Sequence, residues 1–494
     1  MNELSATASA VEQRQAFHVF TVGWELSLIR SLTTPLGERV GIRFTHGLVG
    51  DSRRLGLARK ELPGVEFLPL SKANGDALPA PDYELLSSLE SVGVPTVRSM
   101  IRGDRVLRNR SDGEAFGYAT LLAARMREAF VAAKPDCVLA SFDSLHAMLS
   151  LAVAKSLGIP WVALAFSVIP DDLTGFCKGI MPDTLVPIRR DTCEELLQQA
   201  DEIMRAVRAK RQKIMAYRSP MSLRQRAAQV VHHGANLWRR VSAAKDLGVD
   251  RFTFPTAGER FRDIVRRSMN HFSLPTGKMV TAPPKGRFAF YPLQMSPESS
   301  IDSWAPFYQN QLAFVAQVSL ALPADLEFVV KIHFSDHDNY SRRQLLELTS
   351  LPRVRIAHPN ASSHTFLEAA SLVIAIQGTA SLEAALLGKP VLLFGASPYA
   401  QFPRTERAGR PDQLHEQIRR MLEISAPRDD EVVRAFASYM ARYRVGRVND
   451  WTRPIEEKDL EKLADCFAAL RSYLREPANR RDWYRQPPFV EGPV

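Results

Sequence analysis

Cysteine is scarce in this chain, which has four among 494 residues and no Cys-x-x-Cys pair. This count excludes a disulfide-rich secreted scaffold, and the spacing excludes the common cysteine-based zinc sites. We expect all four to be reduced thiols in a reducing compartment; they are Cys137, Cys177, Cys193 and Cys466.

Long apolar runs are also missing. No segment offers the roughly 18 consecutive apolar residues that a membrane-spanning helix needs. The stretch from Met1 to Gln15 has neither the basic nor the apolar region of a secretory signal. Metal-ligand spacing is absent too, since the adjacent His232 and His233 are not spaced as a ligand pair. We expect a cytoplasmic protein that uses no metal and no cofactor.

The remaining composition is that of a globular protein, with 45% hydrophobic and 24% charged residues. This excludes disordered, collagen-like and coiled-coil chains, and the length predicts two or three domains. The net charge of +10 favours anionic partners. Nucleic acid is not among those we expect, because basic residues are not interleaved with aromatic ones as in a stacking platform.

The N-terminal half shows strands followed by helices. Residues 17–22 predict a strand, Gly23 a turn and residues 24–32 a helix. A second unit has an apolar strand at 137–141, a helix at 145–157 and a strand at 161–166. Continuous apolar strands in a β-α-β order are typical of a parallel sheet covered on both faces. We predict a Rossmann-like domain over residues 16–190.

Residues 191–270 have the pattern of a helical insertion followed by a linker. The polar face of the helices at 201–245 is strongly basic. Two interpretations are open, a solvated face or a surface that docks on anionic lipid and makes the protein peripheral to the inner membrane.

The second half repeats the alternation of strand and helix over residues 285–425. Strands are predicted at 287–291, 328–332, 354–356, 372–376 and 391–394, and helices at 305–320, 342–348, 362–369 and 381–387. Helices at 426–476 and a tail at 477–494 follow. The predicted fold class is α/β, with two Rossmann-like doubly wound parallel sheets facing a cleft and a basic helical insertion.

Ligands of such sheets bind beyond the carboxyl ends of the strands, and three polar clusters lie there. Gln294 and Glu298 follow the first strand in a loop with two prolines, which is typical of a rigid cleft loop. The alternative for their neighbours is that Ser299, Ser300 or Asp302 caps the next helix.

The second cluster is Lys331 and His333, at the end of the next strand. A lysine in a buried strand is costly unless it is paired, and an imidazole at the strand end suits a phosphate or carboxylate. Alternatively, Lys331 faces water on an edge strand and His333 is hydrogen-bonded within its loop.

The third cluster runs from strand through glycine turn to helix and contains Gln377, Gly378, Thr379, Ser381 and Glu383. Small residues, hydroxyl donors and the amino end of a helix together predict a phosphate cradle. Glu383 is expected in the first helical turn, where it accepts hydrogen bonds from ribose hydroxyls or forms a capping arrangement with serine.

Acid–base or nucleophilic chemistry in such a cleft needs a carboxylate or imidazole, here on the lobe opposite the predicted phosphate cradle. Asp143, just after the strand at 137–141, is the predicted catalytic residue. His146, His46 and Asp51 are weaker candidates, and each of the four could instead cap a helix or form a turn.

The motifs of the second half resemble the bacterial capsule polysaccharide biosynthesis family over about residues 285–400. The motifs are Tyr-Pro-Leu-Gln, Pro-Glu-Ser-Ser and Val-Lys-x-His within 288–333, then Gly-Thr-x-x-x-Glu-Ala and Gly-Lys-Pro between 378 and 390. Members resemble GT-B glycosyltransferases, and some transfer Kdo from its CMP-activated form. Because the family often has His-Pro where this chain has His333-Phe334, the donor sugar is left open.

The resemblance implies a glycosyltransferase that holds a nucleotide-sugar donor in its second domain and a lipid-linked or growing glycan acceptor in its first. It implies that Gly378, Thr379 and Ser381 lie near the phosphate, and Glu383 near the ribose. Lys331 and His333 would lie near a phosphate or sugar carboxylate. Two other functions are open: a nucleotide-sugar epimerase or hydrolase, and a non-enzymatic assembly scaffold.

Overall fold

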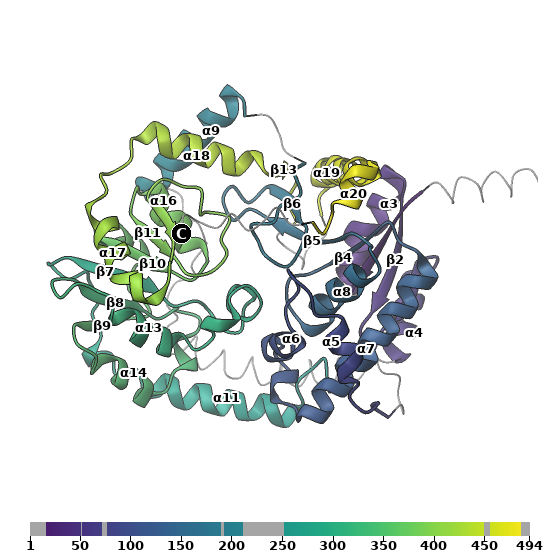
Figure 1. Cartoon of the computed structure of the whole chain (residues 1–494), viewed down its shortest axis with the longest axis horizontal. Helices are drawn as coiled ribbons and strands as arrows, with labels where there is room; N and C mark the ends of the chain where they lie inside the picture. The colour runs from purple at the N-terminus through teal and green to yellow at the C-terminus, as the bar shows by residue number, and fades with distance from the viewer. Residues whose placement is uncertain are drawn as a thin grey trace, which may run out of the picture.

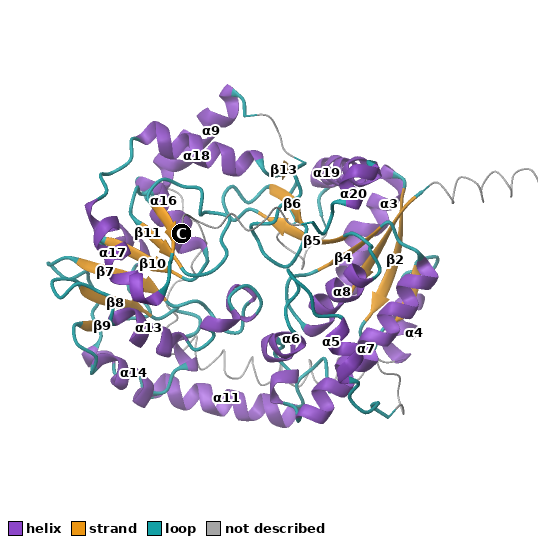
Figure 2. Ribbon diagram, in the orientation of Figure 1, coloured by secondary structure: helices purple, strands orange, loops and turns teal. Residues whose placement is uncertain are grey.

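The structure is a computed structural model that describes residues 16–50, 52–71, 77–188, 192–210, 251–448 and 455–485. Two lobes lie side by side, each built on one mostly parallel sheet (Figure 1; Figure 2). The predicted α/β fold class with two Rossmann-like sheets is confirmed. The segment 211–250, which holds most of the predicted basic insertion, lies outside the described residues.

The N-terminal sheet has the strand order β13-β6-β5-β4-β1-β2-β3. Its parallel strands are β1 Phe17–Val22, β2 Ile42–Leu48, β3 Glu66–Pro69, β4 Cys137–Ala140 and β5 Trp161–Phe166. Two antiparallel strands, β6 Leu173–Cys177 and β13 Arg444–Val445, complete one edge. The carboxyl ends of the parallel strands therefore share one edge of the sheet.

Alternate residues of the N-terminal strands enter two different cores. Val19 and Leu139 pack with α2 Leu26–Leu28, α3 Thr34–Val40 and α19 Glu457–Arg475, whereas Phe20 and Val138 pack with α7 Asp112–Ala133 and α8 Leu145–Ser156. Period-two alternation with both faces covered is the pattern of a doubly wound sheet. Four further helices of this lobe are α4 Ser52–Glu61, α5 Tyr83–Ser88, α6 Val97–Gly103 and, after α19, α20 Pro477–Arg481.

The C-terminal sheet is wholly parallel, with the strand order β12-β11-β10-β7-β8-β9. Its strands are β7 Phe288–Pro292, β8 Glu327–Lys331, β9 Val354–Ala357, β10 Leu372–Ala375, β11 Val391–Leu393 and β12 Thr405–Arg407. One face packs on α13 Gln311–Ser319, α14 Arg342–Thr349 and α17 Leu414–Glu423, and the other on α15 Ser363–Ala369 and α16 Thr379–Leu386. Loops at the carboxyl ends of β7, β8 and β10 carry all three predicted clusters.

Several predicted helices have different bounds in the structure. The helix predicted at 24–32 is α2 followed by a π-helical turn, Ile29–Thr33, and then α3. The helix predicted at 305–320 begins at Gln311, because the Asn310 side chain caps it by accepting from the Ala313 amide. The helix predicted from Ser381 begins at Thr379, which makes Gly378 its N-cap.

Helices on both sides of the lobe boundary share one core. In α9 Glu194–Arg208, Leu196 and Met204 pack with Leu382 of α16 and Phe436 of α18 Asp429–Ala441. The same cluster includes Ile169, which follows β5 of the N-terminal sheet. Contacts of this kind fix how the two lobes are oriented.

The chain returns to the N-terminal lobe after α18. β13 pairs with β6, and α19 lies against α3, so that Phe467 and Leu470 are buried in the first core (Figure 1). Trp483 is also buried there. The described residues after 425, which the sequence pattern sets apart as a helical segment and a tail, thus pack on both lobes. Within the described part of the chain, no helix has the length and apolarity that a membrane span requires.

Candidate functional site

The carboxyl ends of the two sheets meet between the lobes. Phe142, which follows β4, packs edge-on against Trp304 of the other lobe, with their ring centroids 5.2 Å apart. On the same side, the backbone carbonyl of Asp302 lies so close to Gly103 of α6 that a Cβ there would come within 2.5 Å of it. The loops after β4 and β7 are therefore in direct contact, and the predicted residues Asp143 and Glu298 lie in them.

Asp143 and Glu298 lie on contacting loops of opposite lobes, and Arg105 of the N-terminal lobe pairs with Asp143. The guanidinium of Arg105 donates to the Asp143 carboxylate at 2.9 Å. Both Arg105 and Asp143 influence the pKa of Glu298, the guanidinium lowering it and the carboxylate raising it. Two carboxylates and one cation, supplied by both lobes, are a suitable set for proton transfer and charge stabilisation.

The local backbone explains why Asp143 does not cap helix α8. Ser144, the N-cap of α8, has a φ of 84°, which is unusual for a residue other than glycine and marks local strain. The Leu145 amide, at the start of α8, donates to the buried carboxylate of Asp104 at 2.9 Å. Because Asp104 fills the capping role, the alternative that Asp143 caps the helix is excluded.

Glu298 is a half-buried carboxylate in the loop after β7. Burial raises its pKa, and the hydroxyl of Ser300, which donates to it at 2.6 Å, opposes that rise. Burial likewise raises the pKa of Asp302, with Arg108 opposing it from 3.7 Å. The capping alternative for Ser299, Ser300 and Asp302 is wrong, because no side chain caps the short helix α12 Ser299–Asp302.

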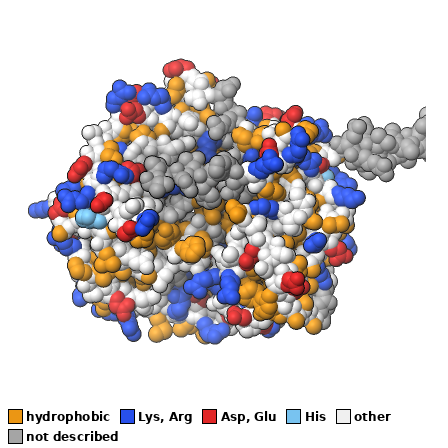
Figure 3. Space-filling view, in the orientation of Figure 1, with side chains coloured by type: hydrophobic (Ala, Val, Ile, Leu, Met, Phe, Trp, Pro, Cys, Tyr) orange, Lys and Arg blue, Asp and Glu red, His pale blue; other side chains and the backbone are white. Residues whose placement is uncertain are grey.

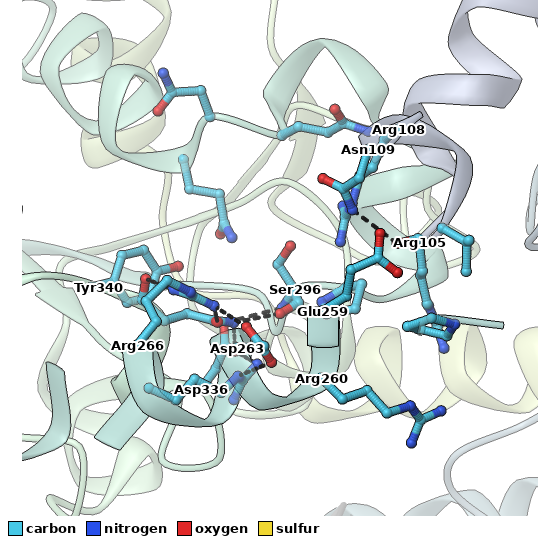
Figure 4. Close-up of a pocket in the computed structure, with 18 of the residues that line it drawn as sticks. Arg105, Arg108, Asn109, Glu259, Arg260, Asp263, Arg266, Ser296, Asp336 and Tyr340 are labelled. Carbon is cyan, nitrogen blue, oxygen red and sulfur yellow. Dashed lines mark hydrogen bonds and ion pairs between the residues drawn. The ribbon is translucent and has the colours of Figure 1, made fainter. Parts of the chain in front are cut away.

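A cavity of about 550 Å³ adjoins this cluster and is lined by both lobes (Figure 4). Arg105 and Arg108 come from the N-terminal lobe, Ser296 and Asp336 from the C-terminal lobe, and Arg260 from α11 Ala257–Phe272. Asp336 accepts from the Ser296 amide at 3.1 Å, and burial raises its pKa to about 7. Most of the residues that line the cavity are charged or carry amide groups, and the cavity is large enough for a sugar-sized ligand.

The amino end of α16 has the backbone that the sequence predicts for an anion cradle. Gly378 has a φ of 113°, and a Cβ there would lie 2.7 Å from the Oε1 atom of Gln294. Gln294 also donates from Nε2 to the Gln377 carbonyl, so this side chain braces the turn between β10 and α16. Gly378 and Thr379 are half-buried, whereas Ser381 is fully buried and its hydroxyl donates to the Gly378 carbonyl at 2.5 Å. Ser381 therefore stabilises the turn itself.

Glu383 lies in the second turn of α16. The prediction that it lies in the first turn is wrong, because the helix begins at Thr379 and not at Ser381. The capping arrangement with serine is excluded for the same reason. Its carboxylate contacts Nδ1 of His364 from α15 at 2.5 Å. Burial raises the pKa of Glu383, and His364 opposes the rise. Nε2 of His364 is buried and has no hydrogen-bond partner among the described residues.

Lys331 and His333 lie at the carboxyl end of β8, between β7 and β9. The edge-strand alternative for Lys331 is wrong, since the residue is 5% exposed and its Nζ donates to the Pro359 carbonyl at 3.0 Å. Burial lowers its pKa to about 8. Burial and Lys331 lower the pKa of His333 to about 4, so its imidazole is neutral at pH 7. The Ser335 amide donates to Nδ1 of His333 at 3.3 Å, which leaves Nε2 as the protonated nitrogen.

The weaker histidine candidates have structural partners. His46 is 1% exposed, lies 2.6 Å from the Thr21 hydroxyl, and has its pKa lowered to about 3 by burial. The ring of His146 fills the space beside Gly23, where a Cβ would collide with it. Asp51 lies outside the described residues.

The sequence patterns miss Arg105, Arg108 and Asp104. Asp104 and Arg105 lie between α6 and the 3₁₀ turn Leu107–Asn109, and Arg108 lies in that turn, in a stretch that contains no strand and follows no motif. Arg105 pairs with Asp143 within the N-terminal lobe, whereas Arg108 lies 3.7 Å from Asp302 of the other lobe. No group of three His, Cys, Asp or Glu residues in the described ranges is arranged to hold a metal ion.

Two facing α/β lobes with polar loops at the carboxyl ends of both sheets define a GT-B-like protein. A comparison of sequences adds a resemblance to a family over part of the chain. Residues 252–444 match the profile described as "Capsule polysaccharide biosynthesis protein". The resemblance to that family, predicted from the motifs, is thereby confirmed for this stretch. The match includes the whole C-terminal sheet and α18, and it excludes strands β1 to β6.

One curated relative is Protein FixF of Sinorhizobium fredii (strain NBRC 101917 / NGR234). It is 27% identical over 182 residues, which are 36% of this chain and 43% of FixF, so the match spans less than half of that protein. Among solved structures, the Thermosulfurimonas dismutans KpsC beta Kdo 2,7 transferase covers 70% of this chain and 90% of its own, at 12% identity and a TM-score of 0.35. UDP-GlcNAc 2-epimerase from Neisseria meningitidis covers 86% and 99%, at 11% identity and a TM-score of 0.23. Scores this low do not establish a fold; the strand order of the two sheets defines it instead.

Proposed function

We propose that this chain is a glycosyltransferase, metal-independent and of the GT-B type, which moves a sugar from a nucleotide-sugar donor to a lipid-linked or growing glycan acceptor in capsule or surface polysaccharide biosynthesis. The observation that carries the proposal is that Asp143, paired with Arg105, and Glu298 lie on contacting loops of opposite lobes. A site assembled from both lobes suits a reaction with two substrates, one bound to each sheet. The family resemblance makes CMP-Kdo the first donor to test.

In this proposal the donor phosphate binds at the amino end of α16. The first amides of a helix have no partner within the helix, and its dipole favours an anion there. Gly378 and Thr379 offer half-buried backbone at that point. Gln294 and Gln377 fix the turn, Ser381 supports it, and Glu383 with His364 faces the ribose. The charge of the departing nucleotide is then stabilised by these amides and by nearby basic side chains.

The acceptor hydroxyl lies in the cleft beside Asp143. One bond forms between the acceptor oxygen and the anomeric carbon, and the bond from that carbon to the phosphate oxygen breaks. The hydroxyl proton passes to the Asp143 carboxylate, which acts as the base. In a double displacement the same carboxylate would attack the anomeric carbon as the phosphate leaves; the acceptor oxygen would then displace the carboxylate, which takes up the hydroxyl proton. In either role, the ion pair between Arg105 and Asp143 must break or loosen when substrate binds, so that the carboxylate can contact the substrate.

The proposal is tested by incubating the full chain with CMP-, UDP-, GDP- or dTDP-linked sugars, with and without a glycan acceptor, and following products by mass spectrometry. We expect one donor to be consumed only when acceptor is present, with the acceptor gaining the mass of one sugar. Donor turnover without acceptor would instead indicate the epimerase or hydrolase. The absence of turnover with any donor would favour the assembly scaffold.

Donor binding should depend on pH through Lys331. With a free-state pKa of about 8, its ammonium loses its proton above that pH, and only the charged form attracts a phosphate. We therefore expect the donor dissociation constant, measured by calorimetry, to rise by up to about tenfold per pH unit above pH 8. The Lys331→Met variant should bind weakly and lose this dependence.

Lys389→Met is the matched control for that experiment. Burial also lowers the pKa of Lys389, but the residue precedes β11 and so lies at the opposite edge of the C-terminal sheet. Its variant should keep the pH dependence of the native chain. If the pH dependence of donor binding survives in Lys331→Met and disappears in Lys389→Met, Lys331 is not part of the donor site.

A further inference from the structure

Helix α11 exposes its apolar side chains to solvent. None of its residues is buried. Phe261 is 62% exposed, Val265 42%, Met269 67% and Phe272 81%. Large apolar side chains are normally exposed singly, so four on one helix call for an explanation.

These four residues form one continuous stripe. Their spacings of four, four and three residues place them on the same face of the helix. The opposite face is polar and points into the protein, where Arg260 and Asp263 line the cavity between the lobes. Arg267 on that face also pairs with Asp338 at 2.8 Å. The helix is therefore amphipathic in the reverse sense, with its charged face inward and its apolar face outward.

Basic side chains border this apolar stripe. Arg262 is exposed on α11 and has no salt-bridge partner among the described residues. Arg342, exposed at the start of α14, donates to the Ser273 carbonyl at 3.3 Å and so lies beside the carboxyl end of α11. The acidic residues of α11 are already engaged, Asp263 with Arg266 at 2.6 Å and Glu259 with Arg110. The border of the stripe thus has a surplus of positive charge.

We propose that this face of α11 docks on an anionic lipid bilayer. An exposed apolar stripe flanked by arginines is the pattern of a helix that lies in the membrane interface, with its apolar side chains among the acyl chains and its cations at the headgroups. A second copy of the chain fits less well as the partner. A two-fold contact through this stripe would bring Arg262 and Arg342 of both copies together, with no acidic groups available to pair with them.

The position of α11 suits this role. It runs along one edge of the molecule beneath both lobes (Figure 1), and basic and apolar side chains lie side by side along that edge (Figure 3). Because the inner face of the same helix lines the cavity, docking would bring the bilayer within one helix diameter of the interlobe space. The inference does not depend on the proposed transfer reaction. It also places membrane contact outside the basic segment 201–245.

The test is sedimentation of the full chain with vesicles of phosphatidylcholine alone and with vesicles of equal parts phosphatidylcholine and phosphatidylglycerol. We expect the chain to pellet with the mixed vesicles and to remain in solution with the neutral ones. The Phe261→Ser/Met269→Ser/Phe272→Ser variant should bind the mixed vesicles at least about tenfold more weakly, because three apolar side chains no longer enter the lipid. Arg262→Glu should weaken binding to them as well.

The control variant is Val131→Ser/Leu320→Ser, which removes two exposed apolar side chains that lie elsewhere on the surface, 54% and 88% exposed. It should bind as the native chain does. The melting temperature of each variant, measured without lipid, verifies folding. Unchanged vesicle binding by the triple variant, binding to neither vesicle, or a native dimer that the triple variant dissociates would each overturn the proposal.

Discussion

Replacing Asp143 by Asn is expected to lower kcat for sugar transfer by about 10²–10⁴-fold, with little change in donor affinity. The amide keeps the size of the side chain but cannot take up the acceptor proton. Donor affinity should persist because Asp143 lies on the lobe opposite the predicted phosphate cradle. The measurement is steady-state transfer kinetics together with calorimetric binding of the donor.

Asp136→Asn is the matched control. Asp136 immediately precedes β4, whereas Asp143 follows that strand, and the side-chain exposures of the two residues are nearly equal, 32% and 33%. Asp136 pairs with Arg480 at 3.0 Å, far from the cleft, so its variant should lose some stability but little kcat per folded molecule. A D143N variant with nearly native kcat would exclude Asp143 as base and as nucleophile. Glu298→Gln would then become the informative variant.

Gly378→Ala is expected to abolish most donor binding and to destabilise the fold by about 1–3 kcal/mol. Its φ of 113° is strained for any residue with a Cβ, and that Cβ would lie 2.7 Å from the Gln294 side chain. Relief of the clash must move Gln294 or the turn, and either shift displaces the amides at the start of α16. We expect a dissociation constant at least about tenfold higher, since each tenfold corresponds to about 1.4 kcal/mol.

Gly388→Ala separates backbone strain from loss of the site. Gly388 also has a positive φ, 70°, but its Cβ would meet only Pro427 at 3.5 Å, an ordinary contact. It lies just beyond the carboxyl end of α16, the end away from the predicted cradle. Its variant should be destabilised and should still bind donor. Equal loss of donor binding in both variants would show that Gly378→Ala weakens binding by destabilising the fold, and not by displacing the amides of the cradle.

Much of the fold could be predicted because strands buried on both faces are uniformly apolar and alternate with helices. β5 has the predicted bounds, and β10 ends one residue early. Strands β2 and β3 are missed because polar residues interrupt them. β2 contains Arg43 and Thr45, and Thr45 finds a partner only across the sheet, where it donates to Glu66 at 2.8 Å. The sequence pattern alone cannot show such a pairing.

The sequence pattern predicts those residues of the site that directly follow a strand, but not those that reach the site through contacts distant in the chain. As predicted, Asp143 follows β4, Glu298 follows β7 and Gly378 follows β10. Arg105 pairs with Asp143 although 38 residues separate them in the chain, and no local pattern encodes that contact. The helix boundary that moved Glu383 into the second turn depends on the positive φ of Gly378, which the sequence permits without requiring.

The most direct test of the account is a crystal structure of the full chain with its nucleotide-sugar, or with the free nucleotide. We expect the phosphate within hydrogen-bond distance of the amides from Gly378 to Ala380, and the sugar between Asp143 and Glu298. A nucleotide bound in the N-terminal lobe, or only in the cavity beside α11, would contradict the assignment of donor and acceptor to the two lobes.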